Sequence, residues 1–165
     1  MMKKLGWILG LALVLCGCGA AETYETIADE QVQPVMAEPR QVYVALPEDS
    51  VLPVMESEQG KIYICGDYDV AVLTLSGGDL DATVRAVSGF GRDEVTLIQT
   101  ETGEVDKYEF VWTMASEMGQ QVGRATILDD GSYHYVLSAT VSAEKIQEYQ
   151  EIFNGMFESY ELVSY

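Results

Sequence analysis

Residues 122–141 read VGRATILDDGSYHYVLSATV, and this stretch carries the strongest β-hairpin signal in the chain. Asp130-Gly131 is a dipeptide typical of tight hairpin turns, and runs with the composition of strands flank it. Alternate residues of the returning run are apolar and share one face of a strand, namely Tyr133, Tyr135, Leu137, Ala139 and Val141. The stretch therefore predicts two long antiparallel strands.

Strand and turn signals continue on the N-terminal side of this hairpin. The other expected strands span residues 42–46, 51–56, 61–65, 70–75, 94–100 and 108–113. Hairpin turns are expected at Gln59-Gly60 and Thr102-Gly103. The run over 70–75 is apolar on both faces, which is typical of a central strand covered on both sides.

Two helices are predicted, one between the strands and one after them. Asp79 is expected to cap the first, whose apolar residues have helical spacing and which ends at Gly89. Ser142 is expected to cap the second, whose apolar stripe consists of Ile146, Tyr149, Phe153, Met156 and Phe157. This order predicts one α+β domain over residues 42–165, an antiparallel β-sheet flanked by helices.

The order of the elements resembles that of the PsbP-like family. The most similar stretch runs from Gly123-Arg124-Ala125-Thr126 through Asp130-Gly131-Ser132-Tyr133 to Tyr135-Val136-Leu137. Phe157-Glu158-Ser159-Tyr160 matches the end of that family's final helix, where a Ser and an aromatic residue follow. The resemblance implies an α/β/α sandwich over residues 42–163. The family includes photosystem subunits, a nuclear transport cofactor and bacterial lipoproteins, so its fold carries little functional information.

The N-terminus resembles the signal peptide of a bacterial lipoprotein. Two lysines precede an apolar run over residues 5–15, which is typical of a secretory signal. Leu15-Cys16-Gly17-Cys18 then matches a lipobox. The resemblance implies that residues 1–17 are removed by cleavage between Gly17 and Cys18, and that Cys18 carries a diacylglyceryl group. Stable membrane anchoring takes two signals, and the two acyl chains of the diacylglyceryl group would supply them.

Alternatives to this interpretation stay open. A plain secretory signal would fit the charge and length but would not require a cysteine after Gly17, and an uncleaved anchor is a third option. A transmembrane helix needs about 20 apolar residues, more than this run supplies. Residues 18–41 are predicted to be an acidic flexible tether, with an edge strand or short helix over 27–36 as the alternative.

The chain is strongly acidic. It has 27 acidic and nine basic residues, a formal charge of −18, and loss of Lys3 and Lys4 with the signal would make it −20. Such a charge argues against binding to nucleic acid, whose phosphates need Lys and Arg. It also argues against broad contact with anionic lipid headgroups. We therefore expect no nucleic acid partner, and attachment to the membrane through the lipid alone. Cations or basic partners stay possible.

His134 is the only histidine, and Cys65 is the only cysteine of the predicted domain. A zinc site needs three or four ligands, and a catalytic triad needs a nucleophile, a base and an orienting group. No motif around Cys65 indicates a nucleophile. We expect His134 to be an ordinary strand residue on the face opposite Tyr133 and Tyr135, and Cys65 to be a small buried hydrophobic residue. A Cys65–His134 or Ser–His pair and a disulfide between chains are the alternatives.

Acidic residues occur in pairs, at Asp67-x-Asp69, Asp79-x-Asp81, Asp93-Glu94 and Asp129-Asp130. Each pair lies where a turn or a helix cap is expected, which explains it structurally. A calcium loop starting at Asp67 would need Gly at its sixth position and Glu at its twelfth, where the chain has Val72 and Gly78. We predict no metal, cofactor or catalytic residue, while a weak cation site built from separate loops stays open.

These features predict a non-enzymatic lipoprotein, anchored by Cys18, that displays a small α+β domain outside the cytoplasmic membrane. The domain would face the cell surface or the periplasm and bind another protein of the cell envelope. The alternative is an extracytoplasmic module that binds a ligand or a cation. An enzyme that depends on Cys65 or His134 is a third hypothesis. The oligomeric state stays open.

Overall fold

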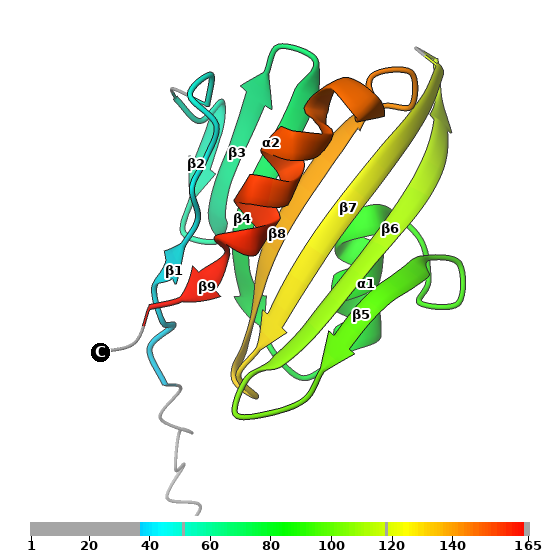
Figure 1. The fold of residues 1–165 in the computed structure, drawn as a ribbon. Helices are drawn as coiled ribbons and strands as arrows, with labels where there is room; N and C mark the ends of the chain where they lie inside the picture. The colour runs from blue at the N-terminus through cyan, green and yellow to red at the C-terminus, as the bar shows by residue number, and fades with distance from the viewer. Residues whose placement is uncertain (1–36, 51, 118, 164–165) are drawn as a thin grey trace, which may run out of the picture. The chain divides into compact units, whose positions relative to one another are not determined.

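The hairpin over residues 122–141 forms the middle of a seven-stranded antiparallel sheet (Figure 1). The computed structural model describes residues 37–50, 52–117 and 119–163. The strand order is β2-β3-β4-β8-β7-β6-β5. These strands are β2 (Met55–Ser57), β3 (Gly60–Cys65), β4 (Tyr68–Ser76), β5 (Thr96–Glu101), β6 (Asp106–Ser116), β7 (Gly119–Asp129) and β8 (Tyr133–Ser142).

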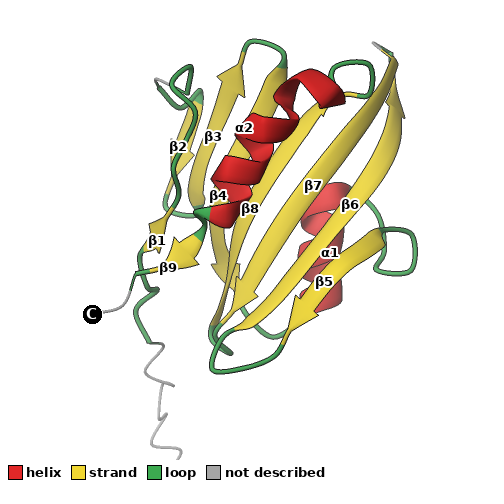
Figure 2. Cartoon of the chain, viewed as in Figure 1, coloured by secondary structure: helices red, strands yellow, loops and turns green. Residues whose placement is uncertain are grey.

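The sheet lies between two helices, α1 (Leu80–Ser88) and α2 (Ile146–Glu158), as Figure 2 shows. Alternate residues of β8 point to opposite faces of the sheet. Leu137 and its neighbours on one face pack against α2, in a core that includes Phe153 and Met156. Val136 faces the other way and packs with Val84 of α1. The predicted α+β fold, an antiparallel sheet flanked by helices, is thus confirmed.

Helix α1 has the ends that the sequence predicts. The Asp79 side chain accepts a hydrogen bond of 3.0 Å from the Ala82 N–H, which satisfies a free donor of the first turn. At the other end, Gly89 adopts a left-handed conformation with φ of 80°. This is the conformation that closes many helices, and glycine adopts it without strain.

Helix α2 has the predicted apolar stripe but not the predicted cap. Phe153, Met156 and Phe157 are buried. The residue before the helix is Lys145, whose side chain makes no capping bond, so the prediction that Ser142 caps α2 is wrong. The reason is that Ser142 is the last residue of β8, paired with Gln121 of β7.

The first predicted strands are shorter than expected. Instead of 42–46, β1 covers Val42–Tyr43 and pairs with β9 (Glu161–Leu162) in a separate two-stranded sheet. Instead of 51–56, the hairpin begins with β2 at Met55, because Pro53 has no N–H to donate to a strand ladder. Neither helix of the described residues is long and apolar enough to cross a membrane.

Candidate functional site

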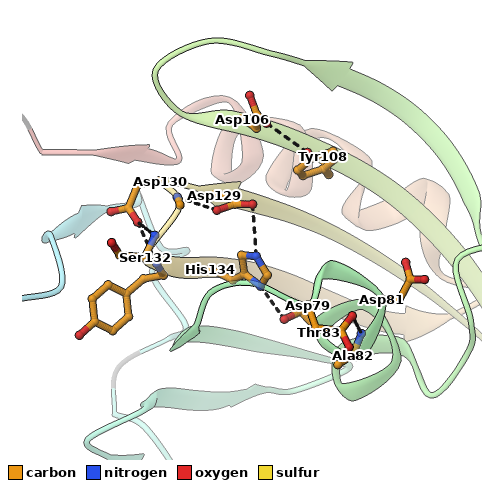
Figure 3. A network of polar contacts seen from close by, with 12 residues as sticks. Asp79, Asp81, Ala82, Thr83, Asp106, Tyr108, Asp129, Asp130, Ser132 and His134 are labelled. Atoms are coloured by element: carbon orange, nitrogen blue, oxygen red, sulfur yellow. Dashed lines mark hydrogen bonds and ion pairs between the residues drawn. The ribbon is translucent and has the colours of Figure 1, made fainter. Parts of the chain in front are cut away.

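His134 lies between β7 and α1 in a row of three polar side chains (Figure 3). Its Nδ1 is 2.7 Å from Thr83 Oγ1 of α1. Its Nε2 is 3.3 Å from Asp129 Oδ2 at the end of β7, without the alignment of a hydrogen bond. Thr83 and His134 are 5% and 0% exposed. The row therefore joins three elements inside the protein.

This row has the residue types of a nucleophile, a base and an orienting group, but it does not have the access that catalysis requires. A substrate cannot approach Thr83 Oγ1, because Thr83 is buried between α1 and the sheet. The contact instead fastens α1 to β8. The expected place of His134, opposite Tyr133 and Tyr135, is confirmed by the packing of the latter two on the α2 side. The contact with Thr83 was not predicted, although this threonine shares the apolar face of the helix.

Cys65 is buried, as predicted. It is 1% exposed in the core on the α2 side, and its Sγ lies 3.1 Å from Ser50 Oγ. His134 faces α1 on the opposite side of the sheet. The structure therefore does not bring Cys65 and His134 together as a catalytic pair.

The paired carboxylates serve turns, caps and local contacts. Asp130 accepts hydrogen bonds from the N–H groups of Ser132 and Tyr133 and from the Tyr135 hydroxyl, over 3.0, 2.8 and 2.8 Å. Burial works against its ionisation, but these bonds outweigh it and lower the pKa of Asp130. Asp67 instead pairs with Lys145, which with the Tyr149 hydroxyl lowers the pKa of Asp67. Within residues 37–50, 52–117 and 119–163, no three His, Cys, Asp or Glu side chains are grouped to hold a metal ion.

A groove of about 240 Å³ lies between α2 and the sheet, and we call it the helix–sheet groove. Its floor includes Val111, Val122 and Val141, from β6, β7 and β8. Its wall includes Ile146 and Phe153 of α2. The lining is mainly apolar, so the groove suits an apolar group of a ligand or a partner.

Arg124 fixes the polar edge of the helix–sheet groove. Its Nε donates to Glu109 Oε1 over 2.8 Å, and its Nη1 donates to Asn154 Oδ1 over 2.9 Å. The guanidinium carbon lies 4.4 Å from the centre of the Phe157 ring, within range of a cation–π contact. Arg124 thus ties β6, β7 and α2 together and holds the wall of the groove against its floor. The buried Glu109 balances its charge.

A second groove, of about 570 Å³, lies along the opposite flank of α2, and we call it the acidic groove. One wall consists of Ala45 and residues 47–49, and the other consists of α2 residues between Glu151 and Met156. Glu48, Asp49 and Glu151 lie around an apolar strip that includes Ile152 and Met156. The sequence did not indicate either groove, because each combines elements that are distant in the chain.

The predicted lipidation site lies outside the described residues. This applies to Cys18, to the cleavage position Gly17-Cys18 and to the tether up to residue 36. The last residues of the predicted tether contact the domain: the Arg40 N–H donates to the Tyr135 hydroxyl over 2.8 Å, and the Gln41 carbonyl accepts from Val163 over 2.8 Å. Lipidation of Cys18 stays a prediction.

No family model and no curated protein matches the chain. Among solved structures, the chain is similar to LpqN, a protein involved in cell envelope biogenesis of Mycobacterium tuberculosis, with 12% identity and a TM-score of 0.49 over 78% of this chain and 87% of that one. Cyanobacterial PsbP from Synechocystis is similar with 12% identity and a TM-score of 0.49, over 79% of this chain and 96% of the other. A Bacteroides thetaiotaomicron structure gives 14% identity and a TM-score of 0.48, over 74% of this chain and 45% of the other. The PsbP-like resemblance is therefore weak and concerns the fold alone.

Proposed function

We propose that this chain is a non-enzymatic lipoprotein, held outside the cytoplasmic membrane by a lipid on Cys18, whose domain binds another protein of the cell envelope. The observation that carries the binding part is the helix–sheet groove, with an apolar floor and a wall fixed by Arg124. A preformed groove requires little ordering of side chains on binding, so more of the contact energy appears as affinity.

The size of the helix–sheet groove favours a protein partner. At about 240 Å³ it is smaller than most small-molecule sites, which measure about 300–1,000 Å³. It suits one or two apolar side chains inserted from a larger surface. Such buried anchors commonly supply most of the energy of an interface of about 800 Å² per partner.

The position of the helix–sheet groove also supports presentation to a partner. The N-terminal segment reaches the domain near Tyr135, where Arg40 contacts its hydroxyl. The groove includes Val141, which lies about 20 Å further along β8. Figure 1 shows β1 beside β9, next to the last turn of α2, whereas the first turn of α2 lies at the other end of that helix. The groove around Val141 therefore lies apart from the point where the chain enters the domain, and is open to a partner.

Site-specific photocrosslinking of the full chain in its native membranes tests this proposal. A crosslinking residue replacing the exposed Gln150, at the groove, should capture a defined partner, whereas the same residue at Thr102, in the β5–β6 turn, should not. Val122→Trp fills the groove and should abolish the product. Equal products at both positions, or a product unaffected by Val122→Trp, would contradict the proposal.

A ligand-binding module is the second candidate, favoured by the apolar, partly enclosed shape of the same groove. Native mass spectrometry of the protein extracted from its membranes distinguishes the two. A small molecule that copurifies with the wild type and is lost from Val122→Trp would favour this candidate. A protein product in the crosslinking experiment with no such molecule would count against it.

A further inference from the structure

The acidic groove combines an exposed apolar strip with uncompensated negative charge. Ile152 is 41% exposed on α2, and the buried Met156 lies beneath it at the bottom of the groove. Glu48 and Asp49 on one wall and Glu151 on the other surround this strip. In the part of the chain that the structure describes, the ion pairs involve other carboxylates and none of these three.

Hydrogen bonds hold the outer wall of the acidic groove in place at both ends. The Ala45 N–H donates to Ser159 Oγ over 2.9 Å, and that hydroxyl donates to the Met156 carbonyl over 2.8 Å. At the other end, the Tyr68 hydroxyl donates to Asp49 Oδ1 over 2.6 Å. Between them, the Ser50 N–H donates to the Pro47 carbonyl over 3.0 Å. The groove is therefore preformed, like the helix–sheet groove.

The carboxylates and the apolar surface of the acidic groove favour different chemical groups in an occupant. An exposed ion pair contributes only about 0–1 kcal/mol, so the carboxylates mainly steer a cation and orient it. Burial of the exposed Ile152 surface needs an apolar group, at about 25 cal/mol per Å² covered. An occupant that uses both features carries positive charge beside an apolar side chain.

We propose that the acidic groove binds a cationic amphipathic segment of a partner protein. One apolar side chain covers Ile152, while Lys or Arg side chains pair with the three carboxylates of the rim. A second copy of the chain is disfavoured, because the chain carries a formal charge of −18. A metal ion alone would leave Ile152 exposed. This inference rests on the proposed protein-binding function and names the chemistry of the partner.

Peptide binding to the full-length protein in detergent tests the inference. The probe is a short fluorescein-labelled peptide in which lysines alternate with leucines. Two companion probes carry glutamine in place of lysine, or serine in place of leucine. Fluorescence anisotropy should show that the first probe binds at least about tenfold more tightly than either companion, a difference of about 1.4 kcal/mol. Its affinity should fall as salt is raised.

Variants assign this binding to the acidic groove. The triple variant Glu48→Gln, Asp49→Asn, Glu151→Gln should weaken probe binding about tenfold, and Ile152→Ser should weaken it by a similar factor. The matched control Glu101→Gln, Glu104→Gln, Glu117→Gln removes as many charges from exposed positions elsewhere and should change affinity less than about twofold. Circular dichroism checks that each variant is folded.

Three results would overturn the inference. Equal weakening by both triple variants would show general attraction to an acidic protein, and binding unaffected by Ile152→Ser would show a purely ionic contact. A cation site would be shown if the probe does not bind, CaCl₂ stabilises the wild type against heat, and the triple variant of the acidic groove loses this stabilisation. The crosslink from position 150 can persist in the triple variant of the acidic groove while probe binding gives one of these three results. In that case the proposed function stands and only this inference falls.

Discussion

At the scale of single residues, buried and partly buried polar contacts connect the separate elements of this domain. Thr83 joins α1 to His134 of β8, and Arg124 joins β7 to Glu109 of β6 and to α2. A buried polar group that loses its partner costs about 1–3 kcal/mol, because no water replaces the lost hydrogen bond. Each of these contacts is therefore expected to contribute to the stability of the domain.

Thr83→Val should destabilise the domain by about 1–3 kcal/mol, because it replaces a hydroxyl by a methyl group and leaves His134 Nδ1 without its partner. Urea unfolding measures the change. Thr102→Val, at an exposed turn, is the control and should change stability by less than about 0.5 kcal/mol. Equal effects of both variants would show that the Thr83–His134 contact does not stabilise the fold.

Asp130→Asn should make stability less dependent on pH. The folded protein lowers the pKa of Asp130 from 3.8, so its ionised form contributes stability above that pH, and the contribution is lost as the pH falls through the lower folded value. The variant should be less stable than the wild type by about 1 kcal/mol at neutral pH, through weaker hydrogen bonds. Urea unfolding should show a smaller difference at acidic pH, below 3.8. A difference that does not change with pH would contradict this account.

At the scale of elements, α2 forms one wall of each candidate groove although its sequence is not optimised for a helix. It begins at Ile146 without a side-chain cap, and Gly155 lies in its interior. Its position comes from packing, because Phe153, Met156 and Phe157 are buried against the sheet. Both grooves use this helix as a wall, so its stability matters for both proposals.

Gly155→Ala should stabilise the protein by about 1 kcal/mol, since glycine lowers helix stability by about that amount relative to alanine. A Cβ at this position would meet no atom within 4 Å, so no clash offsets the gain. Thermal and urea unfolding measure it. Gly123→Ala is the contrasting variant: its Cβ would lie 2.2 Å from the Trp112 ring and should destabilise the protein. A destabilised Gly155→Ala would show that α2 needs glycine for another reason.

At the scale of the whole molecule, net charge and attachment determine how the domain meets its surroundings. A chain with a formal charge of −18 is repelled by anionic lipid headgroups, so a lipid at the N-terminus would be its main membrane attachment.

Cys18→Ala should abolish partitioning of the full-length protein into the detergent phase, because it removes the residue that would carry the acyl chains. Phase separation followed by immunoblotting measures it. Cys16→Ala is the control and should leave partitioning unchanged. Partitioning that survives in Cys18→Ala would refute lipidation at this position.

Local patterns in the sequence determined much of this structure. The Asp130-Gly131 hairpin, the cap at Asp79 and the division of β8 between two faces follow from turn chemistry, capping and a period of two. Each depends on residues close together in the chain, and so does the Cys18 prediction. Tertiary structure decided the rest. Ser142 fails as a cap because pairing with β7 extends through it.

The two grooves, the Thr83–His134 contact and the Arg124 contacts each join segments that are far apart in the chain. Thr83 and His134 are 51 residues apart, and Arg124 and Asn154 are 30. No local period or turn signal encodes such a pair. They exist because burying both faces of one sheet places α1 and α2 on opposite sides of it, and only that packing brings these side chains together.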